Sequence, residues 1–227
     1  MPKILALDTS TDACSVALHI DGQQQEDFRI IPRQHTKELL PMVQQMMQSA
    51  GLKMVELDAI CVGRGPGSFA GIRIATGAAQ GLAFAAQLPM LPVSTLESMA
   101  LAVFSKTGAS RIVTALDARM NEIYVACYEM VDGLPQLVGR EMVVAPDQFV
   151  LPEGDWTAAG SGWRYLDDMS AAVQQRLTLL DDDIYPSAQD MLSLGLRDWN
   201  AGKQVAAEDA LPVYLRDEVA WKKKDQQ

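Results

Sequence analysis

One segment early in the chain carries residue types that could hold a magnesium ion and a phosphate. The segment "LDTSTDACS" places Asp8, Thr9 and Ser10 where an apolar strand is expected to end. A carboxylate there can bind Mg²⁺, and the amides of a tight turn can surround phosphate oxygens. The same residues also suit a hairpin turn in which Asp8 and Thr9 bond to their own backbone. The sequence alone favours this plainer interpretation.

A second segment, "GRGPGSFAG", is rich in glycine and lies between an expected strand and an expected helix. It contributes Gly65, Gly67 and Ser68. Glycine in such a turn indicates a backbone that comes close to something. The neighbour could be a phosphate, another helix or another protein. We interpret these three residues, with Asp8 to Ser10, as candidates for a vestigial phosphate loop.

The later turns that could complete a nucleotide site are less suitable. The segment "DARMNE" occupies the position matching the first turn but contains no glycine, and Arg119 and Met120 would crowd a phosphate there. The segment "AAGSGW", with Gly160 and Gly162, could lie under an adenine ring, although a plain loop explains it equally well. We therefore expect at most weak nucleotide binding.

Residue types that bind catalytic metals are scarce. The chain has two histidines, His19 and His35, with no second ligand at helical spacing near either. A zinc or iron site needs several His, Cys or carboxylate ligands close together. The three cysteines make no CxxC pair and suit buried apolar positions. We expect no metal, no cofactor and no peptidase activity.

The elements that would position these residues form an α/β pattern. Alternating and apolar runs predict strands, and apolar residues at helical spacing predict helices. In the first half we expect strands at 3–8, 14–21, 25–31 and 57–63, a helix at 35–50 that Thr36 caps, and a helix at 70–86. In the second half we expect a strand and turn at 156–163, a helix at 164–175, a strand at 176–180 and a helix from Ser187 to Gly202.

An internal repeat divides the chain into two similar halves. Residues 4–22 and 112–133 each read as a buried strand ending in Asp, a turn, an apolar strand and Asp-Gly. A third strand follows in each half. We predict two lobes of like fold, 1–105 and 106–227, the second ending in a polar tail at 221–227. Chance resemblance of two hairpins is the alternative.

Charge and composition restrict the partners. Formal net charge is −10, so the chain by itself is poorly suited to neutralising nucleic-acid phosphates. The first residues read as a strand and not as a signal peptide. No run approaches the ~20 apolar residues of a membrane-spanning helix. We expect a cytoplasmic protein that contacts RNA only through a partner.

Two helices could form a contact with another molecule. The helix at 70–86 is rich in Gly and Ala, which would allow close approach of a second helix, and the helix at 35–50 is rich in methionine. Packing within the lobe is the alternative for both. The predicted interface residues are Leu39, Met42, Val43, Met46, Met47, Ile74, Gly77, Ala78 and Gly81.

Four segments together resemble a known bacterial family. "ILALDTSTDACSVAL", "HTKELLPMV", "GRGPGSFAGIRIATGAAQGLA" and "PVSTLESMA" are similar, in this order, to the TsaB family, also called YeaZ. The second half fits more loosely, through "TALDARMNEIYVACYE" and "PVYLRD". The resemblance implies an actin-like ATPase (ASKHA) fold with two ribonuclease-H-like lobes, which agrees with the repeat.

The resemblance also implies a function. Members of this family support formation of threonylcarbamoyladenosine at position 37 of tRNAs that read codons starting with A. They bind the catalytic relative TsaD, act with the ATPase TsaE, and form homodimers when alone. Where TsaD has a histidine pair, this chain reads "VSTLESMA". We therefore expect a non-catalytic subunit. The alternatives are an actin-like small-molecule kinase or ATPase and, less favoured, a metallopeptidase.

Overall fold

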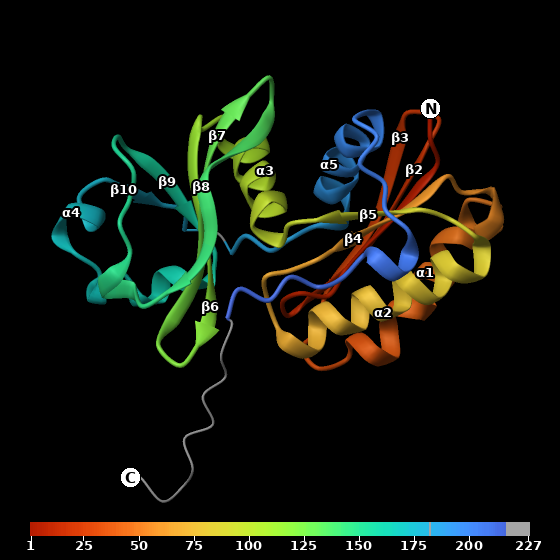
Figure 1. Cartoon of the computed structure of the whole chain (residues 1–227), viewed down its shortest axis with the longest axis horizontal. Helices are drawn as coiled ribbons and strands as arrows, with labels where there is room; N and C mark the ends of the chain where they lie inside the picture. The colour runs from red at the N-terminus through yellow and green to blue at the C-terminus, as the bar shows by residue number, and fades with distance from the viewer. Residues whose placement is uncertain (182, 217–227) are drawn as a thin grey trace, which may run out of the picture.

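The computed structural model describes residues 1–181 and 183–216, and the predicted polar tail at 221–227 lies outside them. The chain forms two lobes side by side, each built on one sheet with helices against it (Figure 1). No helix in the described part of the chain has the length and apolar character needed to cross a bilayer.

The first sheet has five strands in the order β3-β2-β1-β4-β5. The first three pair antiparallel, whereas β4 and β5 add in parallel on the other side of β1. Asp21 and Gly22 both take positive φ in the turn between β2 and β3, a conformation that glycine adopts without strain. The strands are β1 (Ile4–Asp8), β2 (Ala13–Ile20), β3 (Gln23–Ile30), β4 (Ala59–Gly63) and β5 (Met90–Val93).

The second sheet repeats this topology. Its order is β10-β9-β6-β7-β8, with an antiparallel meander of β6, β7 and β8 and parallel β9 and β10 beside β6. The predicted repeat and the two ribonuclease-H-like lobes are confirmed. The strands are β6 (Arg111–Arg119), β7 (Glu122–Val131), β8 (Leu134–Val144), β9 (Trp156–Ala159) and β10 (Leu177–Leu179).

Helices cover both faces of the first sheet (Figure 1). Leu5 and Leu7 of β1 point to the face that packs against α1 (His35–Ser49) and α2 (Phe69–Ala86). Ile4 and Ala6 point to the opposite face, which is covered by α5 (Ala188–Asn200). This alternation follows from the two-residue period of a strand.

Helix packing crosses the predicted division at residue 105. Helix α3 (Thr95–Thr107) buries Leu96, Met99 and Val103 against the second sheet, although it precedes that sheet in the chain. Helix α5 returns from the second half to the first sheet. The two lobes therefore exchange helices across residue 105.

Two local predictions were wrong. The helix expected at 164–175 is a 3₁₀ segment, Ser161–Asp168, followed by the short helix α4 (Ala171–Gln174). The expected cap of α1, Thr36, lies inside the helix, and Gln34 takes the N-cap position without a side-chain hydrogen bond. The helix continues through Pro41, which lies on its exposed side, where water can bond the carbonyl left without a donor.

Candidate functional site

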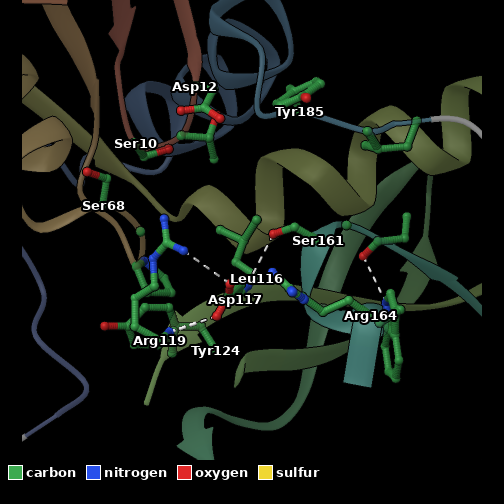
Figure 2. A pocket seen from close by; sticks show the side chains of 18 of the residues that line it. Ser10, Asp12, Ser68, Leu116, Asp117, Arg119, Tyr124, Ser161, Arg164 and Tyr185 are labelled. Atoms are coloured by element: carbon green, nitrogen blue, oxygen red, sulfur yellow. Dashed lines mark hydrogen bonds and ion pairs between the residues drawn. The ribbon is translucent and has the colours of Figure 1, made fainter. Parts of the chain in front are cut away.

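A cavity of about 1120 Å³ lies between the two lobes. Two facing turns line it, one from each sheet, together with the loop before α2 (Figure 2). Ser10, Asp12 and Ser68 lie on the wall formed by the first lobe, and Asp117 and Arg119 lie on the wall formed by the second. The repeat therefore brings the two matching turns to one cleft.

Asp8, the predicted metal-binding carboxylate, lies beneath the cavity and does not line it. Its Oδ1 accepts hydrogen bonds from the backbone N–H and the hydroxyl of Ser10, at 2.9 and 2.8 Å. Its Oδ2 is buried without a hydrogen-bond partner. Burial raises the pKa of this carboxyl to about 7, although both bonds from Ser10 act against the rise. The Asp8 carboxyl is therefore closed off from both the solvent and the cavity.

Thr9 and Ser10 bond to the glycine-rich loop. The Thr9 hydroxyl donates to the Gly71 carbonyl at 2.7 Å, and the Ser68 N–H donates to the Ser10 carbonyl at 2.7 Å. The Ser68 hydroxyl caps α2 by accepting from the Gly71 N–H. The loop's N–H groups at Ser68 and Gly71 are therefore occupied within the chain.

The glycines of this loop touch the turn between β1 and β2. A Cβ added at Gly63 would lie 1.9 Å from Oδ2 of Asp8, and one at Gly67 would lie 2.4 Å from the Ser10 carbonyl. One at Gly71 would lie 1.9 Å from the Thr9 carbonyl. Such distances are impossible for a real side chain, so glycine is required at all three positions. The close neighbour indicated by the sequence is thus this chain's own turn.

Gly65 has a different reason to be glycine. Its φ is +94°, a conformation that L side chains rarely adopt. Its carbonyl accepts a hydrogen bond from the Thr95 N–H at the start of α3. Gly65 therefore lets the loop bend so that its carbonyl reaches the start of α3.

The turn between β6 and β7 is the counterpart in the second lobe. Arg119, Met120 and Asn121 all have positive φ, between 56° and 65°. The Asp117 carboxylate accepts from the Arg119 N–H at 2.8 Å and pairs with the guanidinium of Arg164 at 3.5 Å. Unlike Asp8, this carboxylate reaches the cavity, but arginines already pair with it.

The cavity walls carry charges of both signs. Asp12, Asp181 and Asp183 line one part, and burial, followed by the charges of Asp183 and Asp12, raises the pKa of Tyr185. The arginines that line other parts are Arg73, Arg119, Arg164 and Arg216. A polyphosphate would therefore meet carboxylates beside the first-lobe turn and arginines on other parts of the wall.

The loop of Gly160 and Gly162 packs closely against β6. Added Cβ atoms would lie 2.2 Å from the Ala115 carbonyl and 2.7 Å from the Ala115 Cβ. Ser161, between them, lines the cavity, and its hydroxyl oxygen accepts a hydrogen bond from the Asp117 N–H at 3.1 Å. These glycines serve packing, which is the plainer alternative.

Both imidazoles contact backbone carbonyls. Nδ1 of His19 lies 2.7 Å from the Pro2 carbonyl oxygen, and Nε2 of His35 lies 3.2 Å from that of Ala13. Both rings are buried. Within residues 1–181 and 183–216, no group of three His, Cys, Asp or Glu side chains is placed to hold a metal ion.

The predicted interface residues separate into two groups, one largely buried and one nearer the surface. Helix α1 turns its methionine face inward against the sheet, so these side chains belong to the core of the first lobe. They are Leu39, Met42, Val43, Met46 and Met47, each at most 7% exposed. On α2, Ile74 and Ala78 are half-buried, and Gly77 and Gly81 are exposed.

Sequence reasoning missed one part of the cavity wall, the segment Val213 to Arg216 near the end of the described chain. Tyr214 and Arg216 contact residues about a hundred positions earlier or more, Arg73 and Glu122. No local sequence pattern predicts contacts between residues so far apart in the chain. The segment "PVYLRD" could be noticed only through the family resemblance.

The comparisons with known proteins each match most of the chain. The family model described as TsaD, tRNA N6-adenosine threonylcarbamoyltransferase, matches residues 29–224. The tRNA threonylcarbamoyladenosine biosynthesis protein TsaB of Escherichia coli (strain K12) is 44% identical, over 97% of each chain. Two solved structures are 46% identical with a TM-score of 0.90, covering 95% of this chain and 100% of theirs. One is YeaZ from Pseudomonas aeruginosa, and the other is an uncharacterised protein with similarity to peptidase YEAZ from the same organism.

Proposed function

The chain belongs to the TsaB family of tRNA threonylcarbamoyladenosine biosynthesis proteins, and on that premise we propose that it is the non-catalytic subunit of a tRNA-modifying complex. In this proposal it binds the catalytic subunit TsaD, acts with the ATPase TsaE in the cytoplasm, and forms a homodimer when alone. It contacts tRNA only through the complex, and the product is threonylcarbamoyladenosine at position 37.

The observation that carries the proposal is the pair of exposed glycines in α2. A Cβ added at Gly77 or Gly81 would meet nothing within 4 Å. Neither φ is one that requires glycine. Glycine inside a helix costs roughly 1 kcal/mol relative to alanine. Nothing within the described chain explains that cost, whereas a second helix packed closely on this face would.

The surface around these glycines suits a partner helix. We call Ile74, Gly77, Ala78 and Gly81 the α2 face. The side chain of Phe84, one turn beyond Gly81, is 77% exposed. Small residues let two helix backbones approach, and a neighbouring aromatic ring supplies apolar area for burial. The α2 face therefore replaces the larger interface predicted from sequence.

Three features support a non-catalytic role. The Asp8 carboxyl is sealed within a turn, both histidines bond to backbone carbonyls, and the Asp117 carboxylate is paired with arginine. A kinase or ATPase would need free turn amides on both sides of the cleft, and a metallopeptidase would need clustered ligands. The cavity is large enough for a nucleotide, so calorimetry with ATP is the direct test of the kinase alternative. Micromolar affinity that Asp8→Ala abolishes would favour it.

The test of the proposed interface is the Gly77→Leu substitution. The added side chain points into open space in the isolated chain, so the fold should be retained. In a packed interface it should cost ~1–3 kcal/mol, by analogy with core overpacking. That range corresponds to roughly a 5- to 150-fold loss of affinity for TsaD. Size-exclusion chromatography and a reconstituted modification assay with TsaD and TsaE measure the effect.

The matched control is Gln189→Leu, which places the same side chain on the exposed side of α5, beyond the opposite face of the sheet. This variant should dimerise, bind TsaD and support modification normally. Circular dichroism and melting verify that both variants are folded. If folded Gly77→Leu protein dimerises and binds TsaD as tightly as the control, the α2 face is not the interface.

A further inference from the structure

The last described residues cross from one lobe to the other along the cavity. We call residues 211–216 the strap. It leaves the first lobe beside α2 and ends at the turn between β6 and β7 (Figure 1). Val213 to Arg216 all line the cavity. We propose that the strap is a releasable tie that sets how far the cleft between the lobes opens.

In the first lobe the strap is held by Arg73 of α2. The Arg73 guanidinium lies 3.4 Å from the centre of the Phe69 ring and 5.2 Å from that of Tyr214. Its Nε donates a hydrogen bond to the Tyr214 hydroxyl at 2.8 Å. The Val213 N–H donates to the Arg64 carbonyl at 2.8 Å. Aromatic, cationic and backbone contacts thus attach the strap beside the glycine-rich loop.

In the second lobe the strap is held through Arg216. Its guanidinium pairs with the Glu122 carboxylate and donates to the Ala118 carbonyl at 3.3 Å. It also lies 3.5 Å from the Met120 sulfur. These partners flank the turn whose residues 119–121 have left-handed φ, an unfavourable conformation for non-glycine residues. The contact therefore both joins the lobes and steadies a strained turn.

The strap's exposure makes it suited to release. The Tyr214 side chain is 45% exposed and Leu211 is 62% exposed, so detachment would uncover little core. The Arg216 and Glu122 side chains are 20% and 34% exposed, so water reaches their ion pair and can replace it. A different link between the lobes is buried. The Glu141 carboxylate is 8% exposed and accepts hydrogen bonds from Arg64 and Ser94 at a position away from the cavity. In this proposal the two lobes rotate about that link when the strap is released.

The test removes the second-lobe contact in the full-length protein. Arg216→Ala is compared with Arg140→Ala, which removes an exposed arginine of β8 that does not line the cavity. Hydrogen–deuterium exchange of residues 118–122 reports the turn. Double electron–electron resonance between spin labels at Gln44→Cys and Gln136→Cys reports the distance between lobes. The native cysteines are buried and should take up no label.

We expect Arg216→Ala to speed exchange of the turn about tenfold and to broaden the distance distribution, whereas Arg140→Ala changes neither. Arg216→Lys, which keeps the charge for Glu122 but not the planar guanidinium, should be intermediate. An unchanged distance distribution in folded Arg216→Ala protein would overturn the proposal, even if the turn alone exchanges faster. None of these readouts depends on TsaD or on tRNA.

Discussion

At the scale of single residues, the turn between β1 and β2 is a packing device. Asp8 organises it by accepting two bonds from Ser10, while its second oxygen has no partner. The glycines of the neighbouring loop fit against the turn because they have no side chain. Residue types that resemble a phosphate loop can therefore arise from close backbone contact alone.

The Asp8 carboxyl should make stability depend on pH. Its pKa is about 7 in the folded chain, against about 4 for a free aspartate, so folding favours the protonated form. Its stabilising contribution is full below about pH 4 and is lost as the pH rises through 7. In urea unfolding, Asp8→Asn should match wild type below about pH 4 and exceed it at pH 8, by a few kcal/mol at most.

Asp190 provides the matched comparison for this experiment. Burial, followed by the nearby Glu26 charge, raises its pKa to about 7 as well. The free energy of unfolding should therefore fall less between pH 5 and pH 8 in Asp190→Asn than in wild type, independently of the effect of Asp8→Asn. If Asp8→Asn leaves the whole wild-type loss in place, the Asp8 carboxyl is not the titrating group.

At the scale of elements, α2 contains two kinds of glycine. Gly71 lies at its first turn, against the Thr9 carbonyl, and no side chain fits there. Gly77 and Gly81 lie in its exposed middle with open space around them. The first kind is required by this chain's own packing, and the second is explained only by the proposed partner.

Alanine substitutions should separate these two kinds. Gly71→Ala should destabilise the chain by ~1–3 kcal/mol or more, because the Cβ would displace the Thr9 carbonyl and its turn. Gly77→Ala should stabilise the isolated chain by up to ~1 kcal/mol through helix propensity. Both are measured by chemical denaturation. A loss of stability in Gly77→Ala would show that this glycine is needed within the chain itself.

At the scale of the whole molecule, the lobes are interdependent because they exchange helices. Helix α5 brings Met191, Leu192 and Leu194 to the first sheet from the far end of the chain. Helix α3 leaves the first half to cover the second sheet. Links between the lobes, such as the partly buried Arg197–Glu97 pair of α5 and α3, reinforce the exchange.

A fragment of residues 1–105 should therefore fail to fold. It would expose the apolar face of β1, β4 and β5 that α5 covers, together with the apolar face of α3. The designed comparison joins residues 1–93 to 186–212 through a flexible linker and restores α5 without α3. Circular dichroism melting should be cooperative only for the joined chain. Cooperative melting of 1–105 would instead support the division predicted from sequence.

The sequence by itself determined the local elements and their repetition. Strand alternation, the Asp-Gly turns at 21–22 and 132–133, and helical spacing depend on neighbouring residues, so the two meanders and most helices were predictable. The resemblance of its motifs also placed the chain in its family. The 3₁₀ segment at 161–168 was missed because packing of Gly160 and Gly162 on β6 overrides helical spacing there.

Only the tertiary structure decided which face of each element is covered. The methionines of α1 have the same spacing whether they meet the sheet or a partner, and the structure places them against the sheet. The sealed position of Asp8, the exchange of α3 and α5, and the strap's contact with Arg73 likewise join residues far apart in the chain. Local sequence patterns do not predict such contacts, because burial and close approach depend on which distant segments of the chain pack together.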